Sequence, residues 1–328
     1  MEFWAEVSPG AARAAELAAL DPANPFATPA YLAAEQSFGA EPWLLGCVEG
    51  GKLGYGCLAF LRSGRLNRRL TISSLPAAED TFWRGLREFS RAHHVGILEL
   101  NTFASPPLSI PALGEQTSRM QRHEFLLRLG DPETSLLERM RVNHRQSARK
   151  GIKAGLVVRV TGDPAALDDH IRMIASSMGR RQARGETVSY QSSPDGLRPY
   201  LESGFCRLFL AVLGTEPVSS MLVARASEGA YLYTSGTAPA GMAVGASHFL
   251  MHEIALTSRR EGARVFNLGG VGDLESSLAQ YKRHFGAEPI ALEAAEFYVG
   301  TAWRKAVNTG VRAAQGILRR LSRRSPHA

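Results

Sequence analysis

The same order of segments occurs twice along the chain, and this repetition constrains the fold more than any single motif. Residues 25–130 and residues 160–300 each contain short apolar runs separated by turn residues, then a segment with helical spacing, then another apolar run. Such runs are typical of antiparallel strands, and a helix between two strands is typical of a β-α-β step. We therefore predict an internal duplication built from α/β or α+β layers.

Several segments are clear enough to place. The run over 43–63 predicts two strands joined at Glu49-Gly50-Gly51-Lys52, because a Gly-Gly pair suits a tight hairpin turn. In the second half, we expect a long basic helix over 131–155, a helix over 163–178, a polar loop over 179–196 and a helix over 246–262. The tail, 303–328, predicts a basic amphipathic helix that either packs on the first domain or contacts a membrane or tRNA.

Length and composition define the class of protein. A chain of 328 residues suggests two domains, which we place at 1–148 and 149–328. Hydrophobic residues make up 45% and charged residues 21%, which excludes a disordered chain and a collagen-like repeat. Three scattered cysteines exclude a disulfide framework and fit a reducing compartment. No apolar run reaches the length of a membrane span and the N-terminus does not resemble a signal peptide, so we expect a cytoplasmic protein.

The strongest local signal is Phe266-Asn-Leu-Gly-Gly270 followed by Leu278 to Gly286. Gly269 and Gly270 after a strand let the backbone turn sharply or let a ligand approach closely. Tyr281 and Lys282 follow on a short helix, where a lysine can bind phosphate or stabilise a developing oxyanion. The same spacing also fits a plain alternative, in which Tyr281 is core and Lys282 is a solvated charge.

Together, three segments resemble the FemA/FemB/FemX-like transferases, which are tandem-GNAT-fold proteins. They are NHRQSARKGIKAGLVVRV, GASHFLMHEIALTSRREGARVFNLGG and LAQYKRHFGAEPI, and the resemblance covers roughly residues 139 to 290. It implies two GNAT-like domains with mixed sheets, and acyl transfer to an amine. In Fem proteins the donor is aminoacyl-tRNA and the acceptor is a peptidoglycan precursor; relatives in natural-product pathways act on small peptides or amines.

The resemblance assigns roles to particular residues. It implies that Lys282, with Tyr281 as its aromatic neighbour, lies near the transferring carbonyl and stabilises its oxyanion or binds the tRNA-end phosphate. The reaction also needs a general base or a water relay for the amine proton. Asn101 occupies a position that is acidic in many relatives, which weakens a base there, and Glu99 is a possible substitute.

Basic segments supply candidate substrate contacts. Arg145 and Arg149 lie four residues apart on one helix face and fit the phosphates of tRNA or of a nucleotide-linked precursor, or a solvated helix between two domains. Arg181 and Arg184 belong to a segment that borders the acceptor cleft in the family, and they suit a carboxylate or pyrophosphate. Tyr233 is expected on a strand facing the same cleft.

Three functions remain open at this stage. The leading one is transfer of an aminoacyl group from aminoacyl-tRNA to an amine, forming a peptide bond without a cofactor. The second is an acyl-CoA- or acyl-carrier-dependent N-acyltransferase. Against it, the segment around Gly245 is a degenerate form of the GNAT pyrophosphate loop, with Met242 at its basic position. The third is an inactive domain pair that binds an anionic ligand, a membrane or a partner. No metal is expected, because His248 and His252 lack a third ligand.

Overall fold

The computed structural model describes residues 1–130, 133–186, 193–301, 303 and 305. Its first half contains the elements β1 (Glu2–Val7), α1 (Ala11–Leu20), η1 (Pro25–Ala27), α2 (Pro29–Ser37), β2 (Glu41–Glu49), β3 (Lys52–Ser63), β4 (Arg68–Ile72), α3 (Asp80–Ala92), β5 (Val95–Leu100) and β6 (Glu115–Arg128). The predicted hairpin is confirmed, because β2 and β3 pair antiparallel across Glu49 and Lys52.

The second half consists of α4 (Glu133–Arg139), α5 (Val142–Lys153), β7 (Val157–Thr161), η2 (Pro164–Ala166), α6 (Leu167–Ala183), α7 (Pro194–Glu202), β8 (Cys206–Leu213), β9 (Glu216–Arg225), β10 (Gly229–Thr237), α8 (Pro239–Ala243), α9 (Ala246–Arg260), β11 (Val265–Val271), α10 (Ser277–Arg283) and β12 (Glu288–Tyr298). None of the helices in the described part of the chain is both long enough and apolar enough to cross a bilayer.

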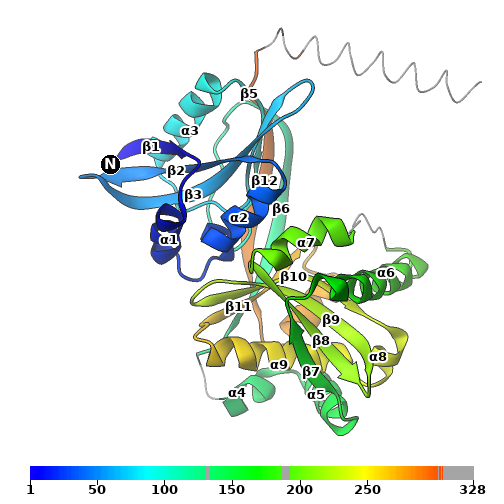
Figure 1. Ribbon diagram of the computed structural model, residues 1–328. Coiled ribbons are helices and arrows are strands. Elements are labelled where there is room, and N and C mark those ends of the chain that lie inside the picture. The colour runs from blue at the N-terminus through cyan, green and yellow to red at the C-terminus, as the bar shows by residue number, and fades with distance from the viewer. Residues whose placement is uncertain (131–132, 187–192, 302, 304, 306–328) are drawn as a thin grey trace, which may run out of the picture.

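The strands form one twelve-stranded sheet that continues through both halves, in the order β1-β2-β3-β4-β5-β12-β6-β11-β10-β9-β8-β7. The long strands β6 and β12 pair along most of their length and run from the upper to the lower half of Figure 1. The end of β12 pairs with β5 of the first half. A strand from the end of the chain thus completes the sheet of the first half.

Each half contains one parallel pair of strands in an otherwise antiparallel arrangement. Strands β4 and β5 are parallel and enclose α3 in sequence, and β10 and β11 are parallel and enclose α8 and α9. This equivalence confirms the predicted mixed α/β architecture. The β10–β11 pairing covers only Gly229 to Tyr231 against Val265 to Asn267, although both strands continue beyond it.

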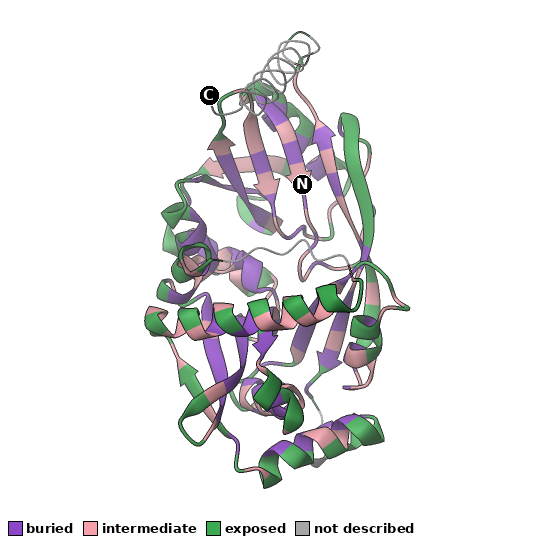
Figure 2. Ribbon diagram, turned by 90° about the vertical axis from the view of Figure 1, so that its right-hand side faces the viewer, coloured by how far each residue is buried: buried purple, intermediate pink, exposed green. Residues whose placement is uncertain are grey.

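Three hydrophobic clusters hold the layers together, and Figure 2 shows that the buried positions are concentrated in the strands of both halves. One cluster joins the halves through aromatic side chains. The ring of Phe26 in η1 lies 5.2 Å from that of Tyr231 in β10 and 5.7 Å from that of Phe205, centroid to centroid. Edge-on ring contacts of this kind stabilise beyond the area they bury, and they hold the two halves together.

The helix expected over 131–155 is wrong in one respect, because it is two helices. Arg141 is extended between α4 and α5, with φ −57° and ψ 146°. Its backbone N–H donates to the carbonyl of His284, 2.9 Å away, instead of continuing the helix. A tertiary contact with the end of α10 therefore overrides a strong local helix signal. Residues 131 and 132 lie outside the described part of the chain.

Other boundaries also differ from the sequence prediction. Helix α6 continues to Ala183, through Gly179, so Arg180 and Arg181 are helical rather than part of a loop. Strand β6 starts at Glu115, although its first seven residues are exposed and all of them except Met120 are polar, so they carry no clear strand pattern. The segment 303–328 falls almost entirely outside the described residues. The domain boundary at 148/149 falls inside α5 and stays a prediction.

Candidate functional site

A cavity of about 760 Å³ lies where β10 and β11 stop pairing. Both strands line it beyond their paired residues, together with α6, α10 and residues of the first half. Seven of the nine predicted site residues line this cavity: Arg181, Arg184, Tyr233, Gly269, Gly270, Tyr281 and Lys282. The divergence of two parallel strands thus opens a site at the carboxyl ends of these strands, close to the junction of the halves.

The Gly269-Gly270 step is a bulge in β11, because the register against β6 shifts between Asn267 and Gly270. Gly269 has φ +77°, a conformation that side-chain-bearing residues rarely adopt. Its backbone N–H donates to the side-chain oxygen of Asn267 at 2.9 Å, which fixes the bulge. The bulge turns the carbonyl groups of both glycines toward α10.

The side chain of Lys282 forms hydrogen bonds with both of these carbonyl groups. Its Nζ donates to the carbonyl oxygen of Gly269 at 2.8 Å and to that of Gly270 at 3.0 Å. An ammonium group has three N–H donors, so one remains for a ligand in the cavity. The side chain is 5% exposed. Burial lowers the pKa of Lys282 to about 7, with Arg122 lowering it further and Glu124 opposing the shift.

Glu124 in β6 is a site residue that the sequence analysis missed. Its carboxylate is fully buried and accepts from Arg122, from the Tyr231 hydroxyl at 2.8 Å, from the Asn267 amide at 2.6 Å and from the backbone of Ala104 at 3.0 Å. These donors come from both halves of the molecule. A carboxylate with so many partners holds its neighbours in place and has its oxygens already occupied by hydrogen bonds.

Tyr281 forms part of an aromatic group behind Lys282. Its ring lies 5.0 Å from that of Phe285 and 5.2 Å from the rings of His144 and His248. Burial raises the pKa of Tyr281 to about 12, so its hydroxyl remains a neutral donor at pH 7. Burial also lowers the pKa of both His144 and His248 to about 4. The rings of both histidines and the tyrosine are therefore uncharged at pH 7.

The rim of the cavity carries Arg181 and Arg184 near the end of α6, but both guanidinium groups are engaged. Arg181 Nε lies 2.7 Å from Glu186, and Arg184 Nη2 lies 2.7 Å from the other oxygen of the same carboxylate. The ring of Tyr233 packs against that of Tyr200 in a tilted arrangement, with 5.2 Å between ring centroids. A ligand at the rim would therefore have to compete with Glu186 for the arginines.

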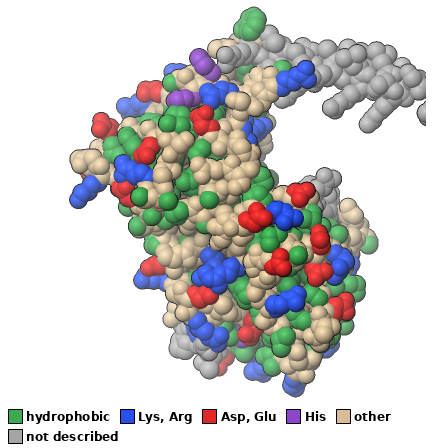
Figure 3. Space-filling model, in the orientation of Figure 1, with side chains coloured by type: hydrophobic (Ala, Val, Ile, Leu, Met, Phe, Trp, Pro, Cys, Tyr) green, Lys and Arg blue, Asp and Glu red, His purple; other side chains and the backbone are tan. Residues whose placement is uncertain are grey.

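Arg145 and Arg149 do not line the cavity. They lie on α5, where Arg145 is half-buried and Arg149 is exposed. The same helix contributes His144 to the aromatic group around Tyr281, so α5 contacts α10, the helix that carries Lys282, through a different residue. On the face shown in Figure 3, positive and negative side chains are interspersed over the lower half.

The N-terminus of α9 is covered by α5. Gly245, the N-cap, has φ +75°, and a Cβ added there would lie 2.3 Å from the carbonyl oxygen of Ser147. The next turn packs equally closely, since a Cβ on Gly151 would lie 2.6 Å from that of Phe249. Met242 is exposed at the position where the GNAT loop carries a basic residue. The backbone of α5 thus packs against the N-cap residue of α9, while Ser247 in the first turn of this helix lines the cavity.

Asn101 and its proposed acidic substitute, Glu99, separate in the structure. Asn101 lines the cavity, whereas Glu99 does not line it and binds Arg69 at 2.7 Å. The side-chain amide of Asn101 lies 3.3 Å from Glu99. Glu99 therefore belongs to an ion-pair group on the surface of the first half rather than to the cavity.

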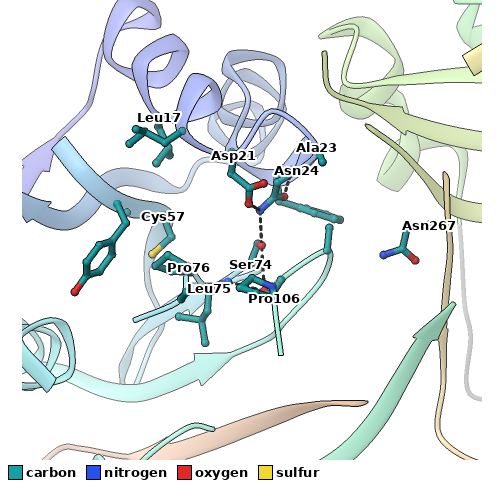
Figure 4. A pocket seen from close by; sticks show the side chains of 18 of the residues that line it. Leu17, Asp21, Ala23, Asn24, Cys57, Ser74, Leu75, Pro76, Pro106 and Asn267 are labelled. Atoms are coloured by element: carbon teal, nitrogen blue, oxygen red, sulfur yellow. Dashed lines mark hydrogen bonds between the residues drawn. The ribbon is translucent and has the colours of Figure 1, made fainter. Parts of the chain in front are cut away.

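A second cavity, of about 460 Å³, lies at the junction of the halves on the side of α1. Figure 4 shows Asn24 bonded to Asp21 and to Ser74, with Asn267 approaching from the second half. None of the predicted site residues lines it. Asn267 lines this cavity, and its side-chain amide donates to Glu124.

Comparison with known proteins agrees with this geometry. Residues 138–283 match the family model described as an acetyltransferase (GNAT) domain, which includes β10, α9, β11 and Lys282. The match covers the part of the chain that contains most of the cavity-lining residues of the second half. No curated protein matches the chain.

Two solved structures define the fold of the whole chain. The crystal structure of FemX is similar with a TM-score of 0.68 at 11% identity, covering 90% of this chain and 97% of that one. A tandem GNAT protein from the clavulanic acid biosynthesis pathway, solved without AcCoA, is similar with a TM-score of 0.51 at 12% identity, covering 92% and 99%. The expected Fem-like tandem GNAT fold is confirmed.

Proposed function

We propose that this protein is an N-acyltransferase that moves an aminoacyl group from aminoacyl-tRNA to the amine of a peptidoglycan precursor or a peptide-type metabolite. The observation that carries the proposal is Lys282, a buried ammonium group at the wall of an open cavity, held by the carbonyls of Gly269 and Gly270. A fixed cation at this place suits a reaction in which negative charge develops on a carbonyl oxygen.

The chemistry of the proposed reaction is aminolysis of an ester. The neutral amine of the acceptor attacks the carbonyl carbon of the aminoacyl ester, and the carbonyl electrons move to oxygen. The remaining N–H of Lys282 donates to that oxyanion. When the tetrahedral intermediate collapses, the C–O bond to the ribose breaks, the ribose oxygen gains a proton and the nitrogen loses one. The ring of Phe125, whose centroid lies 5.8 Å from Lys282 Nζ, borders the ammonium group with an apolar surface.

The choice of donor rests on the N-terminus of α9. A GNAT enzyme that uses coenzyme A binds its pyrophosphate on open backbone N–H groups at the equivalent helix end. Here the Ser147 carbonyl packs against Gly245, and Met242 replaces the basic residue. This arrangement disfavours acyl-CoA and leaves a tRNA ester as the better candidate. Arg145 and Arg149 on α5 supply positive charge for the phosphates of the tRNA acceptor end.

The test is transfer from tRNA to an amine. Purified protein is incubated with a pool of radiolabelled aminoacyl-tRNAs and a metabolite extract, and label is followed into an amide that survives mild base. Transfer of one amino acid is expected, and Lys282→Ala should abolish it while the protein remains folded by circular dichroism. Label moving from acyl-CoA, with every aminoacyl-tRNA left intact, would refute the proposed donor. Loss of all transfer activity with ligand binding intact would favour a binding module.

A further inference from the structure

The guanidinium group of Arg122 has more hydrogen-bonding capacity than the structure uses. Arg122 lies on β6, lines the cavity and is 8% exposed. Its Nη2 donates to Glu124 at 2.5 Å, whereas its Nη1 is buried and has no hydrogen-bond partner among the described residues. A buried donor of a charged group costs free energy unless an oxygen pairs with it. This donor therefore marks a position where a ligand oxygen would be stabilised.

The guanidinium plane is held rigidly beside the cavity. On one side, its Cζ lies 4.3 Å from the centroid of the Phe103 ring, which also lines the cavity. On the other side is Gly270, where an added Cβ would lie 2.6 Å from Nη2. The side chain thus fits between an aromatic face and a glycine, so its fork is already oriented before a ligand arrives.

Gly270 also places the guanidinium close to Lys282. The space where a Cβ of Gly270 would lie is taken up by the Arg122 guanidinium group, and the Gly270 carbonyl accepts a hydrogen bond from Lys282 Nζ at 3.0 Å. Two cations therefore flank one glycine, while Glu124 is the single buried carboxylate among the described residues of this group. With Lys282 protonated, the interior carries one positive charge in excess, which matches a monoanion. Arg181 and Arg184 at the rim differ from Arg122 in that both already form ion pairs with Glu186.

We propose that Arg122, together with Lys282 and Gly270, forms a binding site for a carboxylate carried by the substrate. A carboxylate oxygen on Nη1 completes the hydrogen bonds of the guanidinium group and neutralises the excess charge. The acceptor would then be an amino acid or peptide whose free carboxylate lies a few bonds from its amine. Only this identification of the ligand as the acceptor rests on the proposed transfer reaction; the carboxylate site stands on the geometry alone.

The site can be tested without tRNA. In ¹⁵N-labelled protein, the Nε–H signal of Arg122 is assigned by its disappearance in Arg122→Lys. Sodium acetate and inorganic phosphate are then titrated in separate experiments, replacing sodium chloride at constant ionic strength. Acetate should shift the Arg122 signal saturably while the signal of the exposed Arg149 stays nearly constant. Binding of phosphate alone would overturn the carboxylate assignment, and no saturable shift with either anion would overturn the site.

Two glycines provide a matched pair of variants. Gly270→Ala should weaken acetate binding by about tenfold, because its methyl group displaces the guanidinium fork. Gly272→Ala should leave binding unchanged, because an added Cβ there meets nothing within 4 Å. Equal effects from both variants would contradict the proposed role of Gly270 in the carboxylate site. If acetate binds but no aminoacyl-tRNA is used, the carboxylate site stands and the proposed donor fails, so the two failures are distinguishable.

Discussion

The Nζ atom of Lys282 lies 2.8 Å from the carbonyl oxygen of Gly269, a residue whose left-handed backbone turns that carbonyl out of the β11 ladder. This contact fixes the lysine at the point where β10 and β11 diverge. The ammonium group is buried, and its two hydrogen bonds to carbonyls only partly replace the water that it loses. Burial therefore lowers the pKa of Lys282 to about 7. The pH dependence of the protein should therefore report on this lysine.

The first prediction concerns activity. If protonated Lys282 stabilises the oxyanion, kcat/KM for aminoacyl transfer should fall as pH rises through about 7, because the lysine then loses its proton. Measurement of kcat/KM from pH 6 to pH 9 checks this. A rise of kcat/KM through the same range would instead assign the lysine as the base that removes the amine proton.

The second prediction concerns stability. The folded pKa of Lys282, about 7, lies below its ordinary value of 10.5. Between these values the unfolded chain binds a proton that the folded chain does not, so the free energy of unfolding should rise with pH across that window. In Lys282→Met this contribution disappears. Urea unfolding at pH 7 and pH 9.5 should show a smaller increase in the variant than in the wild type; equal increases would mean that the lysine is solvated.

Glu124 provides the third prediction. Replacing it with glutamine leaves Arg122 and Lys282 buried without their shared counter-charge, which should cost about 3–5 kcal/mol of unfolding free energy. The ion pairs of Glu186 at the cavity rim offer a matched control, and Glu186→Gln should change the free energy of unfolding far less, because water screens these charges. Chemical denaturation of both variants tests the difference. A mild effect at Glu124 would show that its four donors do not depend on its charge.

Sequence patterns locate the second-half part of this site well and miss the first-half part. Gly269, Gly270, Tyr281 and Lys282 occur within a short stretch, so their proximity is encoded locally. Glu124 and Asn267 are 143 residues apart and meet only because β6 pairs with β11. Glu124 could have been noticed as a single carboxylate in the otherwise apolar end of a strand. Its partners could not, because strand order across a twelve-stranded sheet depends on packing between distant segments.

Features of the fold that depend on neighbouring residues were predictable, and those that depend on distant contacts were not. The hairpin at Gly50-Gly51 follows from turn chemistry, and its prediction is confirmed. The interruption between α4 and α5 at Arg141 depends on a hydrogen bond to the carbonyl of His284, just after α10, and no local sequence pattern predicts it. Strand β1 is short and lies at the sheet edge, and its pairing with β2 is likewise decided by a distant partner.

His170 gives the fourth prediction, on acid stability. This side chain is fully buried, its ring nitrogens lie 2.7 Å from Ser220 Oγ and 2.8 Å from Thr234 Oγ1, and burial lowers its pKa to about 4. Between about 4 and 6.5 only the unfolded chain binds the proton, so stability is lost as pH falls through this window. The loss attributable to His170 is on the order of 3 kcal/mol.

His170→Gln keeps hydrogen-bonding capacity but cannot titrate. We expect the variant to lose less unfolding free energy than the wild type between pH 7 and pH 4.5, measured by urea midpoints at both values. The comparison uses the difference between the two pH values, so any constant cost of the substitution cancels. If wild type and variant lose equal amounts, the acid sensitivity arises from other groups, such as His144 and His248.

The fifth prediction tests how tightly α5 packs on the N-terminus of α9. Gly245→Ala and Gly155→Ala both place a side chain at a left-handed position, with φ +75° and +76°. At Gly155 an added Cβ meets nothing within 4 Å, whereas at Gly245 it meets the Ser147 carbonyl at 2.3 Å. Gly155→Ala should cost about 1 kcal/mol of unfolding free energy, and Gly245→Ala about 1–3 kcal/mol more, since α5 must shift. Equal costs would mean that α5 is not tightly packed on α9.

Strand β12 lies between β5 and β6, although these two strands follow each other along the chain. During synthesis on the ribosome, the first half therefore emerges with a gap in its sheet that only residues 288–298 can fill. Until then the backbone of β5 has an open edge on that side, and the long strand β6 has no neighbour there. The two halves cannot mature one after the other, and a chaperone that shields these edges would act on the nascent chain until its last strand arrives.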